Sequence, residues 1–263
     1  MDKEIKEYFD NQLKDWELAR KNFEALENVE RRDFQIGDFK GYLQYNPARA
    51  ISSLAKLDSK SIRERQCFLC ECNRPKEQQG KEIIPGWDLC INPFPILPYH
   101  FTIVAKEHVP QTLNTGIGKE LAEKLPGMVV FFNDAGAGAS APDHLHFQAA
   151  PIDFIPLINI LSKNENAVLP FKVVRTEEEI TKEKAPMNAF FWKNENSGNV
   201  EIAAIPRTTH RPKQYFLEPP ERRALSPGAL DMAGVLVCAI KDDYLILTEE
   251  EIEDIYKQVS IRG

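Results

Sequence analysis

The sequence predicts an α+β fold built around an antiparallel sheet, and three features carry this prediction. Amphipathic segments stand near both ends of the chain, short alternating or apolar stretches lie between them, and several of these stretches are joined by turns. Strands that follow one another through turns pair antiparallel, whereas parallel strands need a long crossover, usually a helix. The 263 residues suit one large domain or two modest ones.

Composition and charge narrow the classes of function. With 43% hydrophobic and 28% charged residues, the chain has the composition of an ordinary globular protein. The formal net charge is −7, whereas a general nucleic-acid-binding protein usually carries a basic surface, so the charge argues against that class. Met1–Lys6 has no apolar signal core, and no apolar run approaches the ~18 residues of a membrane span. We therefore expect a cytoplasmic protein with neither nucleic acid nor membrane as a partner.

The N-terminal segment, residues 2–30, is expected to form one amphipathic helix. Aromatic and aliphatic residues recur near helical spacing among many Glu and Lys residues. Such a helix packs on its own domain or on a partner, so it is a candidate contact surface for a homodimer. The next stretch, residues 33–45, alternates around Gly37-Asp38 and predicts a hairpin.

The cysteines favour metal or redox chemistry over a disulfide framework. The chain has five, an odd number, and Cys67, Cys70 and Cys72 fall within six residues. The pair Cys67-x-x-Cys70 has the spacing of a zinc knuckle, which supplies half of a tetrahedral site. A redox pair or two buried thiols are the alternatives. The pair does not open a helix after a strand, which argues against redox chemistry.

The middle of the chain is expected to be mainly β. The region from Trp87 to Val104 predicts two strands, over 89–92 and 99–104, and His108 follows the second at a strand end. A short helix over 116–125 then precedes a buried strand over 127–132.

The last third of the chain predicts a second hairpin and a closing helix. Strands over 188–192 and 200–205 flank a turn-rich segment, and another strand is expected over 234–240. Thr248 and Glu251 have the spacing of a capping box, which opens a final helix. A further strand is expected over 168–174.

The glycine-rich run Gly136–Ala141 matches the G-x-G-x-x-A pattern of dinucleotide-binding proteins and follows a strand. That pattern requires a helix to open at the glycines, so that its N-terminus holds the pyrophosphate. Pro142 comes next, followed by alternating residues typical of a strand. The context therefore argues against a Rossmann fold.

Three polar residues alternate with two apolar ones in His144-Leu145-His146-Phe147-Gln148. Successive side chains of a strand point to opposite faces, so His144, His146 and Gln148 are expected to share one face. Two imidazoles and an amide on one face are a candidate catalytic or metal-binding group. From the residues alone, a packed or metal-binding pair is the more common arrangement.

The stretch from Asn133 to Gln148 resembles the active-site segment of one branch of the histidine-triad superfamily. This branch contains the galactose-1-phosphate uridylyltransferases and the dinucleoside polyphosphate phosphorylases, and it carries an H-x-H-x-Q motif. The form of the motif here is most similar to that of the GDP-hexose phosphorylases. Cys67–Cys70 resembles the zinc knuckle of the uridylyltransferases, and Asn92-Pro93-Phe94 resembles their nucleoside-contacting strand. Ser226–Val237 is similar to a C-terminal segment of the phosphorylases.

The resemblance implies a structural zinc site and a histidine nucleophile. The zinc ligands it implies are Cys67, Cys70, His108 and His144, and Cys72 is an alternative ligand. It implies that His146 attacks the α-phosphorus of a nucleotide and forms a covalent nucleotidyl-histidine. Gln148 would donate a hydrogen bond to the nucleotidyl phosphate. The hydrolase branch has a histidine there, and a glutamine, which cannot transfer a proton, favours transfer to phosphate over hydrolysis.

The same resemblance assigns substrate contacts. Asn133, Ser140 and the backbone N–H groups of Gly136 and Gly138 are expected to hold phosphates, and Asn92 and Phe94 to contact the nucleoside. Leu145 replaces the proline of the uridylyltransferases, and Asp143 stands where proline or asparagine is usual. Both departures weaken, in particular, the assignment of a uridylyl-hexose as the substrate. A guanidinium group offers paired hydrogen-bond donors to phosphate oxygens. The candidate phosphate contacts therefore include Arg49, Arg207 and Arg211. From the sequence alone, these arginines are equally compatible with surface positions.

The resemblance also implies a fold, a set of substrates and a domain organisation. We expect an extended antiparallel sheet, or half-barrel, built from two related halves with flanking helices. The predicted units are an N-terminal helix (1–32), a half with the knuckle and the motif (33–165) and a second half (166–263). The expected substrates are a nucleoside diphosphate sugar or dinucleoside polyphosphate and a phosphate or sugar-phosphate acceptor. A nucleotide hydrolase and a non-catalytic, zinc-stabilised nucleotide-binding module are the alternatives.

Overall fold

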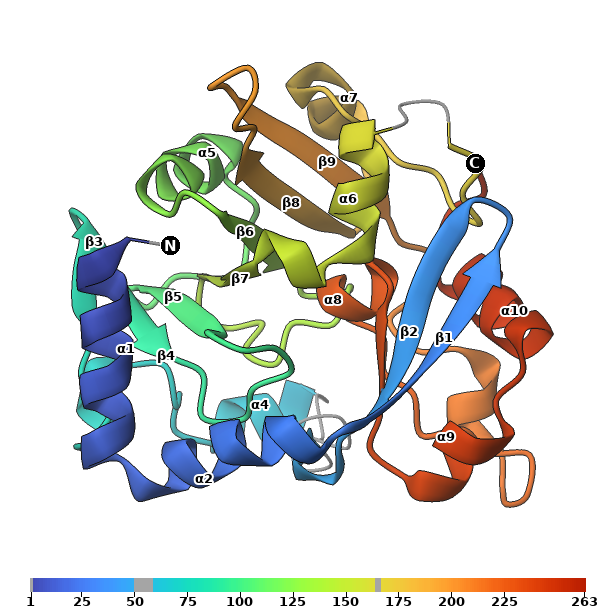
Figure 1. The fold of residues 1–263 in the computed structure, drawn as a ribbon, viewed down its shortest axis with the longest axis horizontal. Helices are drawn as coiled ribbons and strands as arrows, with labels where there is room; N and C mark the ends of the chain where they lie inside the picture. Colours follow the sequence, from blue (N-terminus) through green and yellow to red (C-terminus); the bar gives the residue numbers. More distant parts are fainter. Residues whose placement is uncertain (1, 50–58, 164–166) are drawn as a thin grey trace.

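The computed structural model describes residues 2–49, 59–163 and 167–263 and has an α+β fold, as the sequence predicts (Figure 1). One sheet has seven strands in the order β3-β4-β5-β7-β6-β8-β9, and every neighbouring pair is antiparallel. A second sheet has three strands, in the order β1-β2-β10. The strands are β1 Glu30–Ile36, β2 Phe39–Tyr45, β3 Lys81–Ile84, β4 Trp87–Ile91, β5 Phe101–Ala105, β6 Met128–Asn133, β7 His146–Pro151, β8 Met187–Lys193, β9 Val200–Pro206 and β10 Val235–Cys238.

Helices cover both sheets. The helices are α1 Lys3–Asp15, α2 Glu17–Ala25, α4 Ser59–Glu64, α5 Thr115–Lys124, α6 Pro156–Lys163, α7 Glu177–Lys182, α8 Ala229–Met232, α9 Lys241–Ile246 and α10 Glu249–Val259. The last of these begins at the predicted Thr248 cap, whose hydroxyl accepts a hydrogen bond from the Glu251 N–H at 3.2 Å. None of the helices in the described ranges has both the length and the apolar character needed to cross a membrane.

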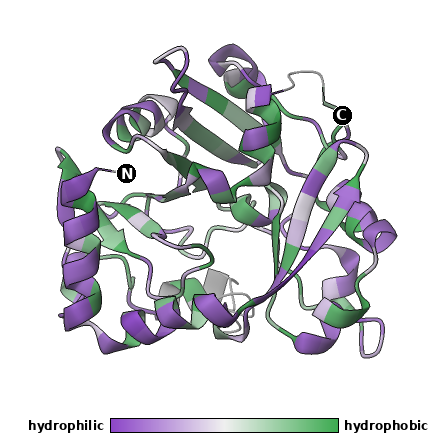
Figure 2. Cartoon of the chain, viewed as in Figure 1, coloured by the Kyte–Doolittle hydropathy of each residue, from purple (hydrophilic) through white to green (hydrophobic). Residues whose placement is uncertain are grey.

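The large sheet separates two apolar cores because its strands alternate between them. In Figure 2 its strands are largely hydrophobic, whereas α1 is largely hydrophilic. On β6, Val130 and Phe132 face a core shared with α1, α2 and α5, whereas Val129 and Phe131 face the small sheet and α6, α8 and α10. The cavity described below lies on the second face. All six residues of β6 are buried, as expected for a central strand covered on both sides.

The small sheet joins a hairpin from the N-terminal part of the chain to a strand from its C-terminal part. β2 pairs with β1 in the predicted hairpin, and its other edge pairs with β10 in parallel, with Leu43 opposite Leu236. In the large sheet, β6 pairs with β8, so the sheet continues across the boundary predicted near residue 165. Strands from either side of the boundary predicted near residue 165 are therefore hydrogen-bonded to each other.

The single helix expected over residues 2–30 is instead two helices, α1 and α2, and its last residue belongs to β1. The break lies at Trp16, whose backbone is extended (φ −120°, ψ 92°) and whose side chain is buried. The bend lets both helices pack on the same core, and it places the rings of Phe9 and Phe23 4.9 Å apart. Helical periodicity alone does not reveal such a bend, because both helices keep their apolar faces.

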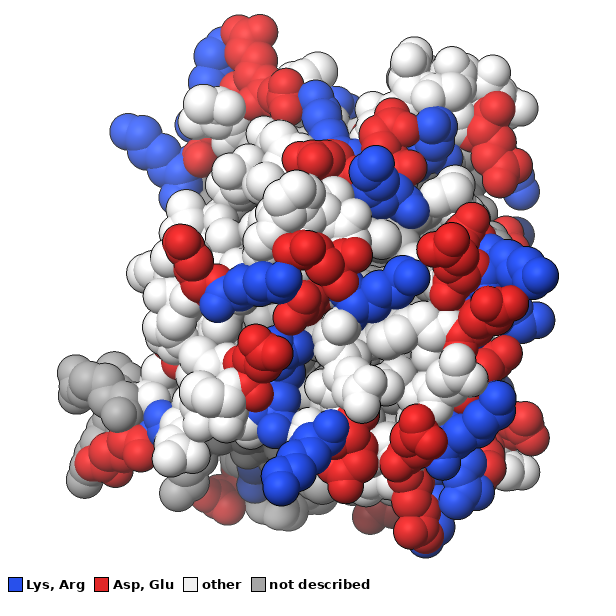
Figure 3. Space-filling model, turned by 90° about the vertical axis from the view of Figure 1, so that its left-hand side faces the viewer, with Lys and Arg blue, Asp and Glu red and all other residues white. Residues whose placement is uncertain are grey.

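Two other predictions differ from the structure. His144 lies in a bend before β7, where its N–H donates to the Ala141 carbonyl at 3.2 Å, so it does not share a strand face with His146 and Gln148. The strand expected over 168–174 is largely irregular, and only Val174 forms an isolated bridge, with Ala204. The other backbone contacts of this stretch lie elsewhere: the Val168 carbonyl accepts from the Asp38 N–H at 3.2 Å, and the Lys172 N–H donates to the Ile261 carbonyl at 2.8 Å. On the face of the molecule that carries α1 and β3, acidic and basic side chains alternate and form ion pairs, such as Lys81–Glu4 and Lys106–Glu82 (Figure 3). That face carries no basic patch of the kind that binds nucleic acid.

Candidate functional site

A cavity of about 440 Å³ lies on the face of the large sheet that is turned toward the small sheet. Its floor is formed by alternating side chains of β5, β7 and β6, including Thr102, His146, Gln148, Phe131 and Asn133. Loops after β2, β4 and β9 and the start of α8 complete its walls. The wall residues include Arg49, Phe68, Asn92, Phe94, Ile96, Gly138, Ser140, His210, Ser226, Leu230, Asp231 and Val237.

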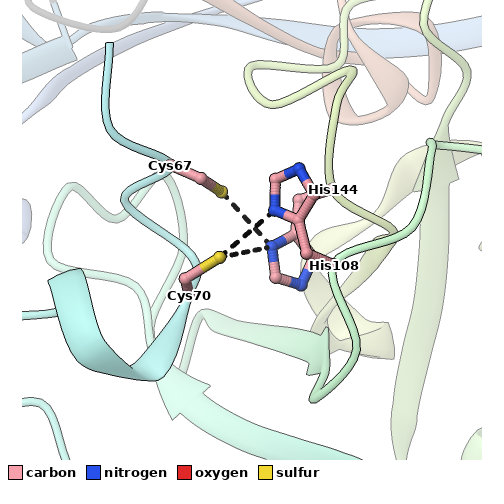
Figure 4. Close-up of side chains that lie close together, drawn as sticks. All are labelled: Cys67, Cys70, His108 and His144. Carbon is pink, nitrogen blue, oxygen red and sulfur yellow. Dashed lines mark hydrogen bonds between the residues drawn. The ribbon is translucent and has the colours of Figure 1, made fainter.

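A cysteine–histidine cluster lies next to this floor (Figure 4). The four ligand atoms of Cys67, Cys70, His108 and His144 all lie within 4.8 Å of one another, so the cluster could hold a metal ion. Cys67 Sγ lies 3.2 Å from His144 Nδ1, and Cys70 Sγ lies 3.2 Å from His108 Nδ1. Zinc bonds of about 2.3 Å to sulfur and about 2.0 Å to nitrogen, at tetrahedral angles, separate sulfur and nitrogen by about 3.5 Å. The side chains therefore fit one tetrahedral ion.

The surrounding hydrogen bonds orient this cluster. His144 Nε2 lies 2.7 Å from the carbonyl oxygen of Ala105, which can only accept, so Nε2 carries the proton and Nδ1 keeps its lone pair for a metal. His108 Nε2 lies 4.0 Å from Asp143 Oδ2, and Arg65 Nη2 lies 2.5 Å from Asp143 Oδ1. Cys72, the alternative ligand considered from the sequence, is exposed and is not one of the four clustered residues.

His146 faces the cavity with a defined tautomer. Its Nδ1 lies 2.8 Å from the carbonyl oxygen of His144 and must therefore donate its proton, which leaves the lone pair on Nε2. Burial lowers the pKa of His146 to about 4, against the opposing effect of this hydrogen bond, so the imidazole is neutral at pH 7. The side chain is 3% exposed, and that surface lies in the cavity. A neutral imidazole with a free Nε2 is a competent nucleophile.

Gln111, which has no apparent signal in the sequence, fixes the backbone on both sides of this histidine. Its side-chain oxygen accepts from the His146 N–H at 2.8 Å, and its amide donates to the His146 carbonyl at 3.0 Å and to the Asn133 carbonyl at 2.8 Å. The side chain is buried, and it links the end of β6 to the start of β7.

Gln148 is oriented by His100, to which sequence reasoning assigned no role. His100 Nδ1 accepts the Ile96 N–H at 3.1 Å, so its Nε2 carries a proton and donates to Gln148 Oε1 at 2.9 Å. With its oxygen engaged, the Gln148 side chain offers only its NH₂ group to the cavity. Tyr99, just before this histidine, has a left-handed φ of 50°, and its ring packs on that of Phe9 with the centroids 4.6 Å apart.

The end of β6 and the glycine-rich loop line the same cavity. Asn133 Oδ1 accepts from Asn188 Nδ2 at 2.9 Å and from the Ala229 N–H at 2.6 Å, so its amide remains as a donor. Gly138 and Ser140 line the cavity, whereas Gly136 is not among its lining residues. Gly138 has φ +99°, and a Cβ there would lie 2.9 Å from the Cα of Gly228. This close approach requires glycine.

The predicted nucleoside contacts, Asn92 and Phe94, lie in the cavity wall, and so does Arg49. Asn92 Oδ1 accepts from the Phe94 N–H at 3.0 Å and shapes the turn after β4. Arg49 Nη1 donates to the Phe94 carbonyl at 2.5 Å. Burial lowers the pKa of Arg49 to about 10, opposed by the nearby Asp231 carboxylate, so the guanidinium is charged at pH 7.

The other two arginines lie behind the wall. Arg207 is 1% exposed and donates to the carbonyl oxygens of Val259, Pro227, Thr209 and His210 as well as to Asn188 Oδ1, so its position favours a structural function. Arg211 is not a lining residue, but its Nε donates to Ser226 Oγ at 3.0 Å, and Ser226 does line the cavity. Sequence reasoning did not single out Asp231, and it placed Ser226 only in the segment that is similar to the phosphorylases.

Solved structures of a yeast enzyme share this fold. The crystal structure of yeast Ap4A phosphorylase Apa2 is similar with a TM-score of 0.58 and 16% identity over 94% of this chain and 97% of its own. Its complex with AMP gives a TM-score of 0.58 and 16% identity over 96% and 97%, and its complex with Ap4A gives 0.54 and 16% over 94% and 97%. At this identity the likeness establishes the histidine-triad-like fold alone.

Comparisons of sequence give one family. No curated protein matches the chain. The model of a family described as "Domain of unknown function (DUF4922)" matches residues 8–151, more than half of the chain. The match begins inside α1 and ends with β7, so it includes the N-terminal helices, both cysteines of the knuckle and the His144–Gln148 motif. The chain therefore belongs to the DUF4922 family.

Proposed function

We propose that this protein is a nucleotidyltransferase or nucleotide phosphorylase that works through a covalent nucleotidyl group on His146. Its donor would be a nucleoside diphosphate sugar or a dinucleoside polyphosphate, and its acceptor a phosphate or sugar phosphate. The observation that carries the proposal is the fixed tautomer of His146, with Nδ1 bonded to the His144 carbonyl at 2.8 Å and Nε2 left free in the cavity wall.

In the first step, the Nε2 lone pair of His146 attacks the α-phosphorus of the donor. A P–N bond forms as the bond from phosphorus to the bridging oxygen breaks, and the electron pair leaves with the phosphorylated leaving group. The imidazole keeps its proton on Nδ1 and gains positive charge, which the carbonyl oxygen of His144 stabilises at 2.8 Å.

In the second step, an oxygen of the acceptor phosphate attacks the same phosphorus. An O–P bond forms, the P–N bond breaks, and its electron pair returns to Nε2 of His146. With inorganic phosphate as acceptor, the product is a nucleoside diphosphate.

Donors around His146 would stabilise the phosphate oxygens in both steps. Gln148 and Asn133 each have their side-chain oxygen engaged by protein donors, so each presents an NH₂ group. Ser140 and the backbone of Gly138 line the same part of the cavity. Fixed donors around a transferring phosphoryl group lower the barrier because they need no reorganisation during the reaction.

Asn92 and Phe94 would contact the nucleoside at the β4 side of the cavity. The surface there is partly apolar, with Phe68, Leu69 and Pro75 near Gln78. Such a surface suits a base and a ribose better than a chain of phosphates. The complexes of the yeast enzyme with AMP and with Ap4A support a nucleotide as substrate class.

We propose that the cysteine–histidine cluster binds one structural zinc ion through Cys67, Cys70, His108 and His144. All four positions of a tetrahedral ion would be taken by the protein, so the ion would tie the knuckle to β7 without an open position for substrate. Because thiolate ligands must be reduced, this proposal favours a cytoplasmic location.

Replacement of His146 tests the proposal. The His146→Ala variant should lose nucleotidyl transfer and should form no phosphoramidate when it is mixed with nucleoside diphosphate sugars or Ap4A. Retention of full transfer by this variant would show that another group is the nucleophile.

A nucleotide hydrolase is the second candidate, because the same nucleotidyl-histidine can be attacked by water. Gln148 argues against it, since an amide held by His100 cannot accept a proton from water. Turnover measured with and without phosphate separates the two activities. Turnover that is independent of phosphate would indicate a hydrolase, and tight nucleotide binding without turnover would indicate a binding module.

A further inference from the structure

A second polar group lines the cavity, apart from the histidine motif. His210 Nε2 lies 2.9 Å from Ser226 Oγ, and Arg211 Nε donates to the same oxygen at 3.0 Å. Ser226 and His210 both line the cavity. They come from the loop after β9 and from the segment before α8, far from the His144–Gln148 motif in the sequence.

The order of the strands places this group at the opposite end from the predicted nucleoside contacts. In the large sheet, β7 with His146 lies between β5 and β6, and β4, which leads to Asn92, lies beyond β5. The segment that contains Ser226 adjoins the β6 side, because Asn133 at the end of β6 accepts from the Ala229 N–H at 2.6 Å. The cavity therefore runs from the Asn92 end, over His146, to the Ser226 end.

Contacts with the glycine-rich loop also place Ser226 at the β6 end of the cavity. A Cβ on Gly138 would lie 2.9 Å from the Cα of Gly228 and 3.1 Å from the carbonyl oxygen of Pro227. The loop expected to hold phosphates thus packs directly against the segment that carries Ser226. A phosphate held beyond the α-phosphate would contact both the glycine-rich loop and the segment that carries Ser226.

A buried arginine preorganises this end of the cavity. Arg207 donates to the carbonyl oxygens of His210 at 3.2 Å and of Pro227 at 3.1 Å, and so it holds the two segments together. No acidic side chain among the described residues hydrogen-bonds to it, but the Asp231 carboxyl lies near it, lines the cavity and accepts from the Gly228 N–H at 2.9 Å. Burial, together with the guanidinium groups of Arg211 and Arg207, lowers the pKa of His210 to about 4.

A hydroxyl, an imidazole and nearby guanidinium groups suit a tetrahedral oxyanion. We propose that Ser226 and His210, supported by Arg211, form the subsite for the phosphate that departs with the leaving group and for the phosphate of the acceptor. This inference rests on the proposed function, and it gives the transfer a direction along the cavity. The acceptor attacks from the site that the leaving group has vacated, opposite the P–N bond to His146.

The test separates loading of His146 from the use of phosphate. Adenosine and guanosine 5′-phosphorimidazolides carry the nucleotidyl group with imidazole as the leaving group, so they load His146 without a phosphate in the proposed subsite. Ser226→Ala should be loaded at a rate within about twofold of wild type. The KM for inorganic phosphate in the second step should rise at least about tenfold, because a hydrogen bond to a charged group is lost.

A matched control and a second acceptor sharpen the result. Ser197→Ala removes a hydroxyl in the exposed turn between β8 and β9, outside the cavity, and should leave the KM for phosphate unchanged. A hexose 1-phosphate used as acceptor tells whether the subsite serves inorganic phosphate, a phosphate monoester or both. The rise in KM should appear for every acceptor that the wild type accepts.

Binding of inorganic phosphate to the unloaded protein, measured by calorimetry, gives a readout that needs no turnover. Ser226→Ala should bind phosphate at least about tenfold more weakly than wild type, and His146→Ala should bind it normally. Equal binding by folded Ser226→Ala and wild type would overturn the subsite. Absence of a phosphoramidate on wild type, together with weaker phosphate binding by Ser226→Ala, would instead overturn the proposed function and leave the subsite standing.

Discussion

His100 donates a hydrogen bond from Nε2 to Gln148 Oε1 at 2.9 Å, and this contact determines which end of the Gln148 side chain faces the substrate. His100 lies just before β5, and Gln148 lies on β7, paired with Thr102. Because the carbonyl oxygen is engaged, the NH₂ group is the part that remains for a phosphate oxygen. An amide free to flip would present its oxygen to phosphate about as readily as its nitrogen.

Loss of this contact should slow transfer. His100→Phe keeps a buried ring but removes the donor, whereas His100→Gln keeps an N–H that reaches the same oxygen. We expect His100→Phe to lower the rate of phosphoramidate formation about fivefold, in line with one hydrogen bond of ~1 kcal/mol, and His100→Gln to restore most of it. Rapid-quench measurements of His146 loading test this. Equal loading rates for His100→Phe and wild type would mean that the contact does not orient Gln148.

Stability should fall as the pH falls through the ordinary range of histidine. Burial, together with the nearby charge of Arg49, lowers the pKa of His100 from 6.5 to about 3 in the folded protein. Between these values the unfolded chain binds a proton that the folded protein does not, so the free energy of unfolding rises with pH. This group contributes up to about 1.4 kcal/mol per pH unit, present above pH 6.5 and lost progressively below it.

The variant His100→Gln isolates this contribution. Its free energy of unfolding, measured with urea between about pH 6 and pH 4.5, should depend less steeply on pH than that of wild type, by close to one proton. His210, whose pKa burial lowers to about 4, contributes the same way in both proteins and cancels in the comparison. Identical slopes for the two proteins would show that His100 is charged in the folded state.

Metal content should follow the four clustered side chains. Cys70→Ser should lose bound zinc, measured by elemental analysis of protein purified without chelator, and should lower the Tm by several degrees because the knuckle is no longer tied to β7. Cys72→Ser changes a neighbouring thiol outside the cluster and is the matched control. Zinc in Cys70→Ser at the wild-type level, or its loss from Cys72→Ser, would assign the ligands differently.

Alanine at Gly138 should damage the site more than alanine at another glycine with positive φ. Gly138 (φ +99°) has the Cα of Gly228 2.9 Å from the position of a Cβ, whereas Gly86 (φ +83°) has nothing within 4 Å. Both variants should lose ~1 kcal/mol or more from backbone strain. Only Gly138→Ala should also lower phosphate binding and transfer, because it separates the glycine-rich loop from the segment before α8. Equal transfer by the two variants would contradict this role of the loop.

Local patterns in the sequence predicted the turns, helix caps and strand faces that depend on neighbouring residues. The turn at Gly37-Asp38 and the Thr248 cap each depend on neighbouring residues, and the structure contains both. The alternation predicted for His144, His146 and Gln148 holds only for His146 and Gln148, because β7 begins at His146. The grouping of Cys67 and Cys70 with His108 came from a resemblance, since no local rule joins residues so far apart. The structure brings these side chains together with His144.

Contacts between segments that are distant in the sequence could not be predicted from these local patterns. The bend at Trp16 depends on the core that both helices cover, and the parallel pairing of β2 with β10 sets Tyr42 opposite Val235, which is distant in the sequence. The function of His100 depends on an Ile96 N–H that fixes its tautomer, which a sequence does not display. Arg207 looked like an anion contact because it stands near other polar residues, yet its guanidinium is satisfied by backbone carbonyls and Asn188.

The most direct test of the central claim is the detection of a nucleotidyl group on His146. Wild-type protein should be mixed with Ap4A and with nucleoside diphosphate sugars in the absence of phosphate, quenched in base to preserve P–N bonds, and analysed by peptide mass spectrometry. The account predicts a nucleotidyl adduct on His146 with at least one donor, absent from His146→Ala and discharged by added phosphate. Turnover of a donor with no adduct at His146, or with an adduct on another residue, would contradict it.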